Sequence, residues 1–178
     1  LHWQWNYIGL IGGEPTLHPN LIQLISILNK YRKKNPQCVI EVVTNGFGPH
    51  FKSKLTKIPN WVSIRNSHKK GRVHLFEKYN LAPIDRKTKS NLTFEKGCPI
   101  TSICGIGLNR FGYYPCGAGA SVDRIFGLNI GIKHLESVSL IKITKSLKQL
   151  CRYCGHFRVN QKMDLSKKQV YSPSWKKA

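Results

Sequence analysis

The sequence predicts an α/β fold from two apolar runs and the helical segment between them. Two short apolar runs, Tyr7–Ile11 and Cys38–Val43, have the composition of buried strands. A segment with helical spacing separates them, so the first part of the chain has the order strand, loop, helix, strand. Such a βαβ unit forms a parallel sheet with a right-handed crossover. A cysteine-rich second half follows, with a glycine-containing hairpin and a helix.

The helix of this unit is predicted from its ends and from its apolar spacing. It opens after His18-Pro19-Asn20 and stops at Asn35-Pro36. Basic residues in its last turn favour the negative end of the helix dipole. Its apolar positions fall at helical spacing and comprise Leu21, Ile22, Leu24, Ile25, Leu28 and Tyr31.

Weaker signals complete the first half of the chain. Phe51–Ile58 predicts a short helix, and Trp61–Arg65 predicts a third strand. Residues 69–96 are polar and interrupted by prolines. We therefore place a domain boundary near residue 90 and expect a first domain over residues 1–90.

A second domain is expected over residues 91–160. Gly105–Leu108 and Gly112–Pro115 predict two strands joined by a tight turn. Leu135–Leu150 predicts a helix with its Leu and Ile side chains facing inward. Residues 161–178 are polar and lysine-rich, and we expect them to form a mobile basic tail.

The chain is strongly basic, with 29 Lys and Arg against 8 Asp and Glu among 178 residues. A formal charge of +21 raises affinity for nucleic acids and other polyanions. The basic residues are scattered in short runs, so solvated faces are the favoured interpretation and nucleic acid is the less favoured partner. No stretch reaches the roughly 20 apolar residues of a membrane helix, and no secretory signal opens the chain. We expect a cytoplasmic protein that does not bind membranes.

The first strand runs directly into Gly12-Gly13-Glu14-Pro15. Ligands bind beyond the carboxyl ends of parallel strands. The two glycines let a ligand approach the backbone, Glu14 offers a carboxylate to an ammonium group, and Pro15 restricts the turn. The alternative is a plain turn from strand to helix.

The second strand ends in Thr44-Asn45-Gly46, at the same edge of the predicted sheet. Its polar side chains and its glycine suit a second wall of the same pocket.

Together these segments resemble a known family. The string Gly-Leu-Ile-Gly-Gly-Glu-Pro-Thr-Leu-His-Pro over residues 9–19, then a helix, then a strand ending in Thr-Asn-Gly, closely resembles the second βαβ unit of radical S-adenosylmethionine (SAM) enzymes. The resemblance implies a partial (βα)₆ barrel and a pocket for SAM.

The resemblance also implies roles for particular residues. The Gly-Gly-Glu turn would bind the methionine amino group of SAM, the Thr-Asn pair would lie near the nucleoside, and the third strand would continue the wall. The SAM-binding residues implied in this way are Gly12, Gly13, Glu14, Pro15, Thr44, Asn45, Ser63 and Arg65.

The chain departs from this family in one respect. Radical SAM enzymes hold their reducing [4Fe–4S] cluster with a Cys-x₃-Cys-x₂-Cys loop upstream of the Gly-Gly-Glu turn. Eleven residues precede Gly12 here, and none is Cys. We expect a truncated fragment of an active enzyme, inactive by itself, with a second [4Fe–4S] cluster only in the full-length protein. The alternative is a degenerate protein without catalysis.

The second half carries a predicted metal site. Its candidate ligands are Cys98, Cys104, Cys116, Cys151 and Cys154. The hairpin would place Cys104 and Cys116 almost opposite each other. The following helix would carry the pair Cys151 and Cys154 back to the same end. Four thiolates suit Zn²⁺ or an iron–sulfur cluster, and spacing does not decide between them.

The order Cys, strand, Gly-x₃-Cys, long gap, Cys-x₂-Cys resembles the SPASM or twitch auxiliary domain that follows many radical SAM barrels. This resemblance implies an auxiliary [4Fe–4S] cluster. Family spacing points to Cys98 as the first ligand, whereas hairpin geometry points to Cys104, so five cysteines compete for four places. His156 is an alternative ligand, and Cys38 is interpreted as a small core residue.

The resemblance implies an oxidoreductase of the radical SAM type that acts by radical chemistry on an unknown substrate. Peptides are a common substrate class in this group, and a flavodoxin or ferredoxin is the implied reductant. The alternative function is a basic, zinc-stabilised nucleic-acid-binding module. The charge and the cysteines support that alternative, but it gives no role to the Gly-Gly-Glu turn.

Overall fold

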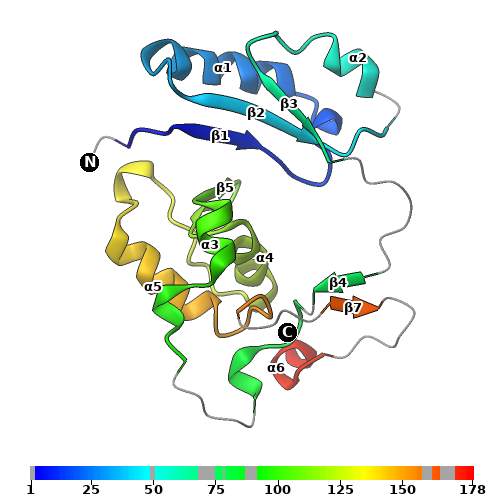
Figure 1. Ribbon diagram of the computed structural model, residues 1–178. Helices are drawn as coiled ribbons and strands as arrows, with labels where there is room; N and C mark the ends of the chain where they lie inside the picture. Colours follow the sequence, from blue (N-terminus) through cyan, green and yellow to red (C-terminus); the bar gives the residue numbers. More distant parts are fainter. Residues whose placement is uncertain are drawn as a thin grey trace. The chain divides into compact units, whose positions relative to one another are not determined.

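The chain folds into two units of mixed α/β structure, residues 1–72 and residues 73–178 (Figure 1). The computed structural model describes residues 3–48, 51–67, 75–77, 79–86, 92–157, 162–164 and 171–178. The boundary expected near residue 90 lies outside these described ranges. The division between the units falls earlier along the chain.

The first unit is built on a three-stranded parallel sheet with the order β1-β2-β3. The strands are β1 (Tyr7–Leu10), β2 (Val39–Thr44) and β3 (Ser63–Asn66). Helix α1 (Leu21–Lys34) connects β1 to β2, and α2 (Phe51–Leu55) lies between β2 and β3. The predicted βαβ unit and third strand are therefore present.

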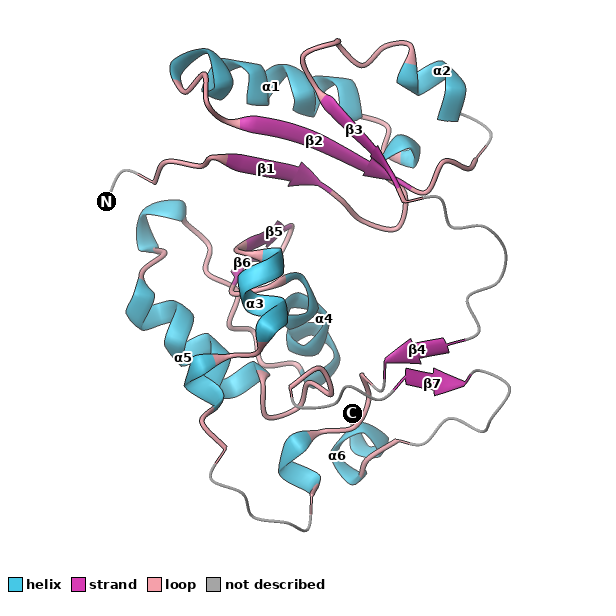
Figure 2. Cartoon of the chain, viewed as in Figure 1, coloured by secondary structure: helices cyan, strands magenta, loops and turns pink. Residues whose placement is uncertain are grey.

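Helices cover one face of this sheet (Figure 2). Strand β2 alternates, with Ile40, Val42 and Thr44 buried and the residues between them more exposed. The buried side chains share a core with Leu21 and Ile25 of α1. This is the pattern of a sheet with one covered and one open face.

The second unit contains two short antiparallel pairs and four helices among its described residues. Strand β4 (Leu75–Glu77) pairs with β7 (Lys162–Asp164), and β5 (Gly107–Asn109) forms a hairpin with β6 (Gly112–Tyr114). The helices are α3 (Pro99–Cys104), α4 (Gly117–Phe126), α5 (Leu140–Leu150) and α6 (Pro173–Lys177). Its short 3-10 turns are η2 (Pro83–Asp85), η3 (Phe94–Lys96) and η4 (Leu135–Ser137). A further 3-10 turn, η1 (Pro15–Leu17), belongs to the first unit.

The hairpin is confirmed, but the helix after it begins later than its apolar pattern predicts. Leu135–Ser137 forms a separate turn. Ser139 then caps α5, because its Oγ accepts a hydrogen bond of 3.3 Å from the backbone N–H of Lys142. A serine cap satisfies a backbone donor at the start of a helix, so α5 begins at Leu140.

Residues 171–178, which belong to the expected basic tail, pack within the second unit. Ser174 donates to both carboxylate oxygens of Asp85, through its backbone N–H at 2.8 Å and its Oγ at 2.7 Å. Trp175 donates from Nε1 to the backbone oxygen of Tyr153 at 2.7 Å. Ser172 accepts from the backbone N–H of Ala82 at 2.9 Å. The polar, lysine-rich composition of this segment did not indicate these contacts, which also include packing of the Trp175 ring on Tyr79 and Phe126.

Within the described ranges, no helix combines the length and the apolar character needed to cross a bilayer.

Candidate functional sites

Four cysteines of the second unit line one small cavity. They are Cys98, Cys116, Cys151 and Cys154, and the last three are buried. Apolar side chains of α5, including Leu150, form part of the same wall. The end of the hairpin and the end of α5 therefore both reach this cavity.

Three separate elements bring these sulfurs together. Cys98 precedes α3, and Cys116 ends the hairpin segment and caps α4. Cys151 follows α5 directly, and Cys154 lies in the turn after it. Because α5 packs into the core through Leu147 and Leu150, its C-terminal end is held at the cavity.

Backbone N–H groups point at two of the sulfurs. The Sγ of Cys116 accepts a hydrogen bond of 3.3 Å from the N–H of Gly119, at the start of α4. Backbone N–H groups of His156 and Phe157 hydrogen bond to Cys154 and lower its pKa. Such donors, together with a helix N-terminus, stabilise thiolates.

Burial outweighs these donors at Cys154. Burial, which is the largest effect, and the neighbouring cysteines Cys116 and Cys98 together raise the pKa of Cys154 to about 12. The pKa of Cys151 is raised for the same reasons, burial first and neighbouring thiols second. The cavity therefore gathers thiols whose thiolate forms need a nearby cation.

Among the described residues, no three His, Cys, Asp or Glu side chains are grouped to hold one metal ion. The four sulfurs instead surround the cavity. Four thiolates without a carboxylate are the donor set of zinc sites and iron–sulfur clusters, so the residues present fit both classes chemically.

The fifth candidate, Cys104, does not line the cavity. It lies at the C-terminal end of α3 and is exposed. Cys98, at the other end of this helix, takes the place that hairpin geometry had suggested for Cys104. His156 also lines the cavity, and its ring packs edge-to-face on Tyr79 at 5.3 Å. Cys38 lies in the core of the first unit, as expected.

A second candidate site lies where β1 and β2 end, in the first unit. Oε1 of Glu14 accepts from the N–H of Thr16 at 3.0 Å, from its Oγ1 at 2.7 Å and from Oγ1 of Thr44 at 2.8 Å. Oε2 accepts from the N–H of Asn45 at 2.7 Å. The carboxylate thus ties the turn after β1 to the end of β2.

These bonds also control the charge of Glu14. Partial burial raises its pKa, but hydrogen bonds from Asn45, Thr16 and Thr44 outweigh burial, and the pKa lies below its ordinary value. Thr16 is fully buried, and its role was missed from the sequence. Its position two residues after Glu14, following a proline, is the signal of such a cap.

Gly12 and Gly13 are exposed, and a Cβ at either position would meet nothing within 4 Å. Neither has a left-handed backbone conformation. Packing and backbone strain therefore do not explain these glycines, and the open backbone beside Glu14 is accessible to a ligand. Pro15, which begins η1, is buried.

The third strand does not continue this site. Arg65 aligns with Val43 in the sheet, so strand alternation puts it on the opposite face from Thr44. Its Nε donates to Oε2 of Glu41 at 2.9 Å, and the hydroxyl of Tyr7 donates to the same oxygen at 2.6 Å. Ser63 aligns with Glu41 on that face. The structure thus joins Glu14, Thr44 and Asn45, and it leaves Ser63 and Arg65 in a separate cluster.

Comparison with protein-family models gives no match, and neither the curated proteins nor the solved structures contain a significant match.

Proposed function

We propose that the chain is part of a radical SAM enzyme that binds SAM at the Glu14 turn and holds an auxiliary [4Fe–4S] cluster. The observation that carries the proposal is the arrangement of Cys98, Cys116, Cys151 and Cys154 around one cavity. Three separate elements contribute these residues, and four cysteine thiolates are the usual ligand set of a [4Fe–4S] cluster.

We propose a cluster rather than a zinc ion because the order of the cysteines resembles that of SPASM and twitch domains. A zinc ion needs its four sulfurs about 2.3 Å from one atom. In a [4Fe–4S] cluster each thiolate binds a different iron, so the sulfurs surround a volume rather than a point. The four cysteines line one cavity, and metal analysis decides between the two cases. When bound, such a cluster would accept or donate one electron, or would anchor a substrate.

The Glu14 turn suits the amino-acid end of SAM. Hydrogen bonds from Thr16, Thr44 and Asn45 orient the carboxylate and keep it ionised. Oε2 accepts one of these bonds and keeps a further acceptor position for an ammonium group. The backbone at Gly12 and Gly13 is open, since a Cβ at either position would meet nothing within 4 Å.

Radical generation requires a further cluster, and these 178 residues contain no Cys-x₃-Cys-x₂-Cys loop. We therefore propose radical chemistry for the chain only together with such a loop, on an unknown substrate for which a peptide is the first class to test. The isolated chain, incubated with SAM and dithionite, is expected to release no 5′-deoxyadenosine. We also propose a cytoplasmic location, because no cysteine forms a disulfide.

The alternative proposal is a zinc-stabilised module that binds nucleic acid, which the charge of +21 favours. Anaerobic purification followed by metal analysis separates the two. The cluster proposal predicts a brown chain with broad absorption near 400 nm and about four iron atoms and four labile sulfides. A colourless chain with one zinc ion contradicts it and supports the module.

A further inference from the structure

One cysteine of the second unit lies outside the cavity but on a helix that helps to form it. Cys104 is a free, exposed thiol at the last position of α3. The same helix contributes Ile100 and Thr101 to the cavity wall. Residues three and four apart share one face of a helix, so Cys104 continues the face of α3 that meets the cavity. This phase places Cys104 at the rim of the cavity.

The β5–β6 hairpin brings a cavity cysteine to the same rim. Gly107 pairs with Tyr114 at the open end of the hairpin. Continued by two residues, this register sets Cys116 opposite Gly105, the residue after Cys104. A Cβ at Gly107 would lie 3.5 Å from the backbone carbonyl carbon of Cys116, so the two segments stay side by side beyond their paired residues. Cys104 and Cys116 therefore flank the open end of the hairpin.

The electrostatics of Cys116 agree with this placement. Burial, the largest effect, acts with the neighbouring Cys98 and Cys104 to raise the pKa of Cys116. A like charge raises a pKa only when it is close. Cys104 is thus near enough to Cys116 to influence its charge, although Cys104 itself is exposed.

We propose that Cys104 and Cys116 form a reversible disulfide when the chain meets a peroxide, and that Cys104 reacts first. Redox-sensing cysteines are accessible to solvent and often stand beside a resolving cysteine. Cys104 is exposed and Cys116 is buried, which gives the first role to Cys104 and the second to Cys116. The inference concerns these two thiols and does not depend on the proposed function.

The reaction balances with hydrogen peroxide as the oxidant. The sulfur of Cys104 attacks one peroxide oxygen, the O–O bond breaks, and a sulfenic acid and one water result. The sulfur of Cys116 then attacks the sulfenic sulfur, so that an S–S bond forms, the S–O bond breaks and a second water leaves. The two thiols together lose two electrons and two protons, and the peroxide takes them up.

Such a disulfide would change what the cavity can bind. It removes Cys116 from the four cysteines that line the cavity and leaves Cys98, Cys151 and Cys154. Three thiols do not supply the four-thiolate set of a structural zinc site or of a [4Fe–4S] cluster. Oxidation would therefore block metal loading, and reduction by a cellular thiol would restore the set of four.

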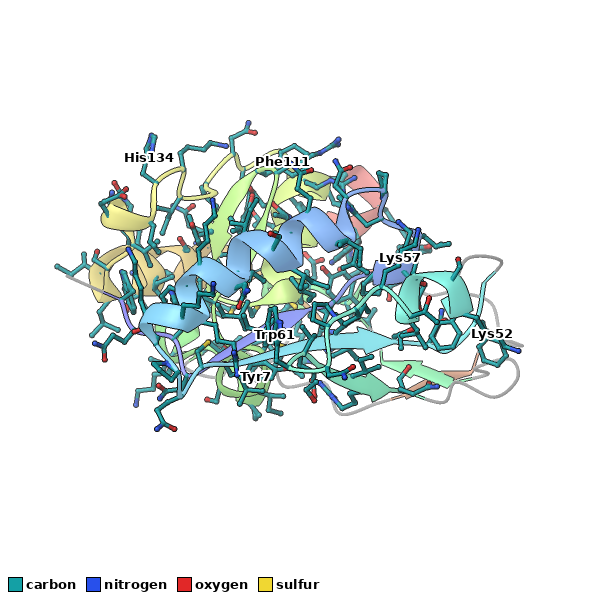
Figure 3. All side chains as sticks on the ribbon, turned by 90° about the horizontal axis from the view of Figure 1, so that it is seen from above. Tyr7, Lys52, Lys57, Trp61, Phe111 and His134 are labelled. Atoms are coloured by element: carbon teal, nitrogen blue, oxygen red, sulfur yellow. The ribbon has the colours of Figure 1, made fainter. Side chains whose placement is uncertain are left out.

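The test treats the reduced full chain, freed of metal by a chelator, with one equivalent of hydrogen peroxide. Remaining thiols are blocked with N-ethylmaleimide, and disulfides are mapped by mass spectrometry after trypsin digestion. Trypsin cuts after Arg110, next to the hairpin residue Phe111, which is labelled in Figure 3. Cys104 and Cys116 then fall on different peptides. Cys98 shares the peptide of Cys104, and fragmentation shows which of the two carries N-ethylmaleimide.

The matched control moves the exposed thiol to the other side of α3. The double variant Ser102→Cys/Cys104→Ser keeps the number of cysteines, and Ser102 is exposed as Cys104 is. Two residues correspond to about 200° around a helix axis, so the displaced thiol faces away from Cys116. Cys104→Ser alone removes the exposed thiol. Far-UV circular dichroism checks that each variant is folded.

We expect the peptide pair joined through Cys104 and Cys116 to be the main disulfide product of the wild type. Its yield should fall at least about tenfold in the displaced-thiol variant, because a disulfide tolerates only a narrow range of Cα separations. In Cys104→Ser, Cys116 should remain free and react with N-ethylmaleimide. The same treatment in concentrated urea should lose the preference for this pair, because the fold no longer brings the two thiols together.

The proposal is overturned if the main product of the wild type joins Cys151 to Cys154 or Cys98 to Cys116, or if Cys104 ends as a sulfinic acid without a partner. It is also overturned if the displaced thiol links to Cys116 as readily as Cys104 does. All of these results come from the metal-free chain, so they are separate from the iron analysis that tests the proposed function.

Discussion

Thr44 Oγ1 donates a hydrogen bond of 2.8 Å to Oε1 of Glu14, across thirty residues of sequence. This bond joins the turn after β1 to the end of β2 and orients a carboxylate beside an open glycine backbone. Thr44 is fully buried, so the donor side of this bond is shielded from water.

Thr44→Val should weaken both the fold and the binding of SAM. The substitution preserves shape but leaves Glu14 without one of its donors, and a bond to a charged group is worth about 1.5–3 kcal/mol. Urea unfolding should show a loss of this size, and calorimetric titration should show weaker SAM binding. Thr44→Ser keeps the hydroxyl and serves as the control; equal losses in both variants would show that packing, and not the bond, is responsible.

The stability contributed by Glu14 should depend on pH. Its pKa lies below the ordinary value of 4.5 because hydrogen bonds to the carboxylate outweigh the effect of burial. A carboxyl with a lowered folded-state pKa stabilises the fold fully above its unfolded pKa, and this contribution disappears as pH falls through the folded pKa. The stability difference between wild type and Glu14→Gln should therefore be constant near neutral pH and shrink below about pH 4.5. A difference that grew on acidification would contradict this assignment.

Gly12→Ala should leave the fold intact and weaken ligand binding. A Cβ at Gly12 meets no protein atom within 4 Å, and its backbone conformation suits alanine, so stability should rise by up to about 1 kcal/mol. SAM affinity should fall by about tenfold if the ligand approaches this backbone. Gly131→Ala is the contrasting variant and should destabilise the chain, because its Cβ would collide with Phe111. Unchanged SAM affinity in Gly12→Ala would remove this turn from the site.

Cys98→Ala should abolish the auxiliary cluster, and Cys104→Ala should keep it. The two residues lie at opposite ends of α3, but Cys98 lines the cavity whereas Cys104 is exposed. Iron and labile sulfide per chain, measured after identical anaerobic reconstitution, check this pair. Loss of iron in Cys104→Ala with retention in Cys98→Ala would reverse the assignment.

Ser174→Ala should destabilise the second unit by about 1–3 kcal/mol, because it removes the hydroxyl that donates to Asp85 at 2.7 Å. Lys176→Ala, on the same helix, controls for general effects on α6. Urea unfolding of both variants measures the difference. Equal stabilities would mean that α6 contributes little to this unit.

The sequence predicted the elements whose apolar spacing is regular. The β1–α1–β2 unit was predictable because Ile40 and Val42 alternate on a strand and Leu21 and Ile25 recur on a helix. The hairpin was predictable from Gly112, which adopts a positive φ of 125° at its turn. In both cases the residues that specify the element lie within that element.

The elements that could not be predicted depend on capping and on contacts distant in sequence. Helix α3 is six residues long and was not predicted; it separates Cys98, which lines the cavity, from the exposed Cys104 to which the hairpin argument pointed. Helix α4 opens with Gly117-Ala-Gly-Ala, a weak helix-forming segment that depends on the cap at Cys116. The packing of the chain end depends on Asp85 and Ser174, which are 89 residues apart.

The most direct measurement is Mössbauer spectroscopy of the wild-type chain reconstituted anaerobically with ⁵⁷Fe and sulfide. A [4Fe–4S]²⁺ cluster held by Cys98, Cys116, Cys151 and Cys154 predicts diamagnetic quadrupole doublets that account for nearly all of the bound iron. Spectra dominated by mononuclear high-spin iron, or a chain that retains no iron while zinc remains bound, would contradict the account.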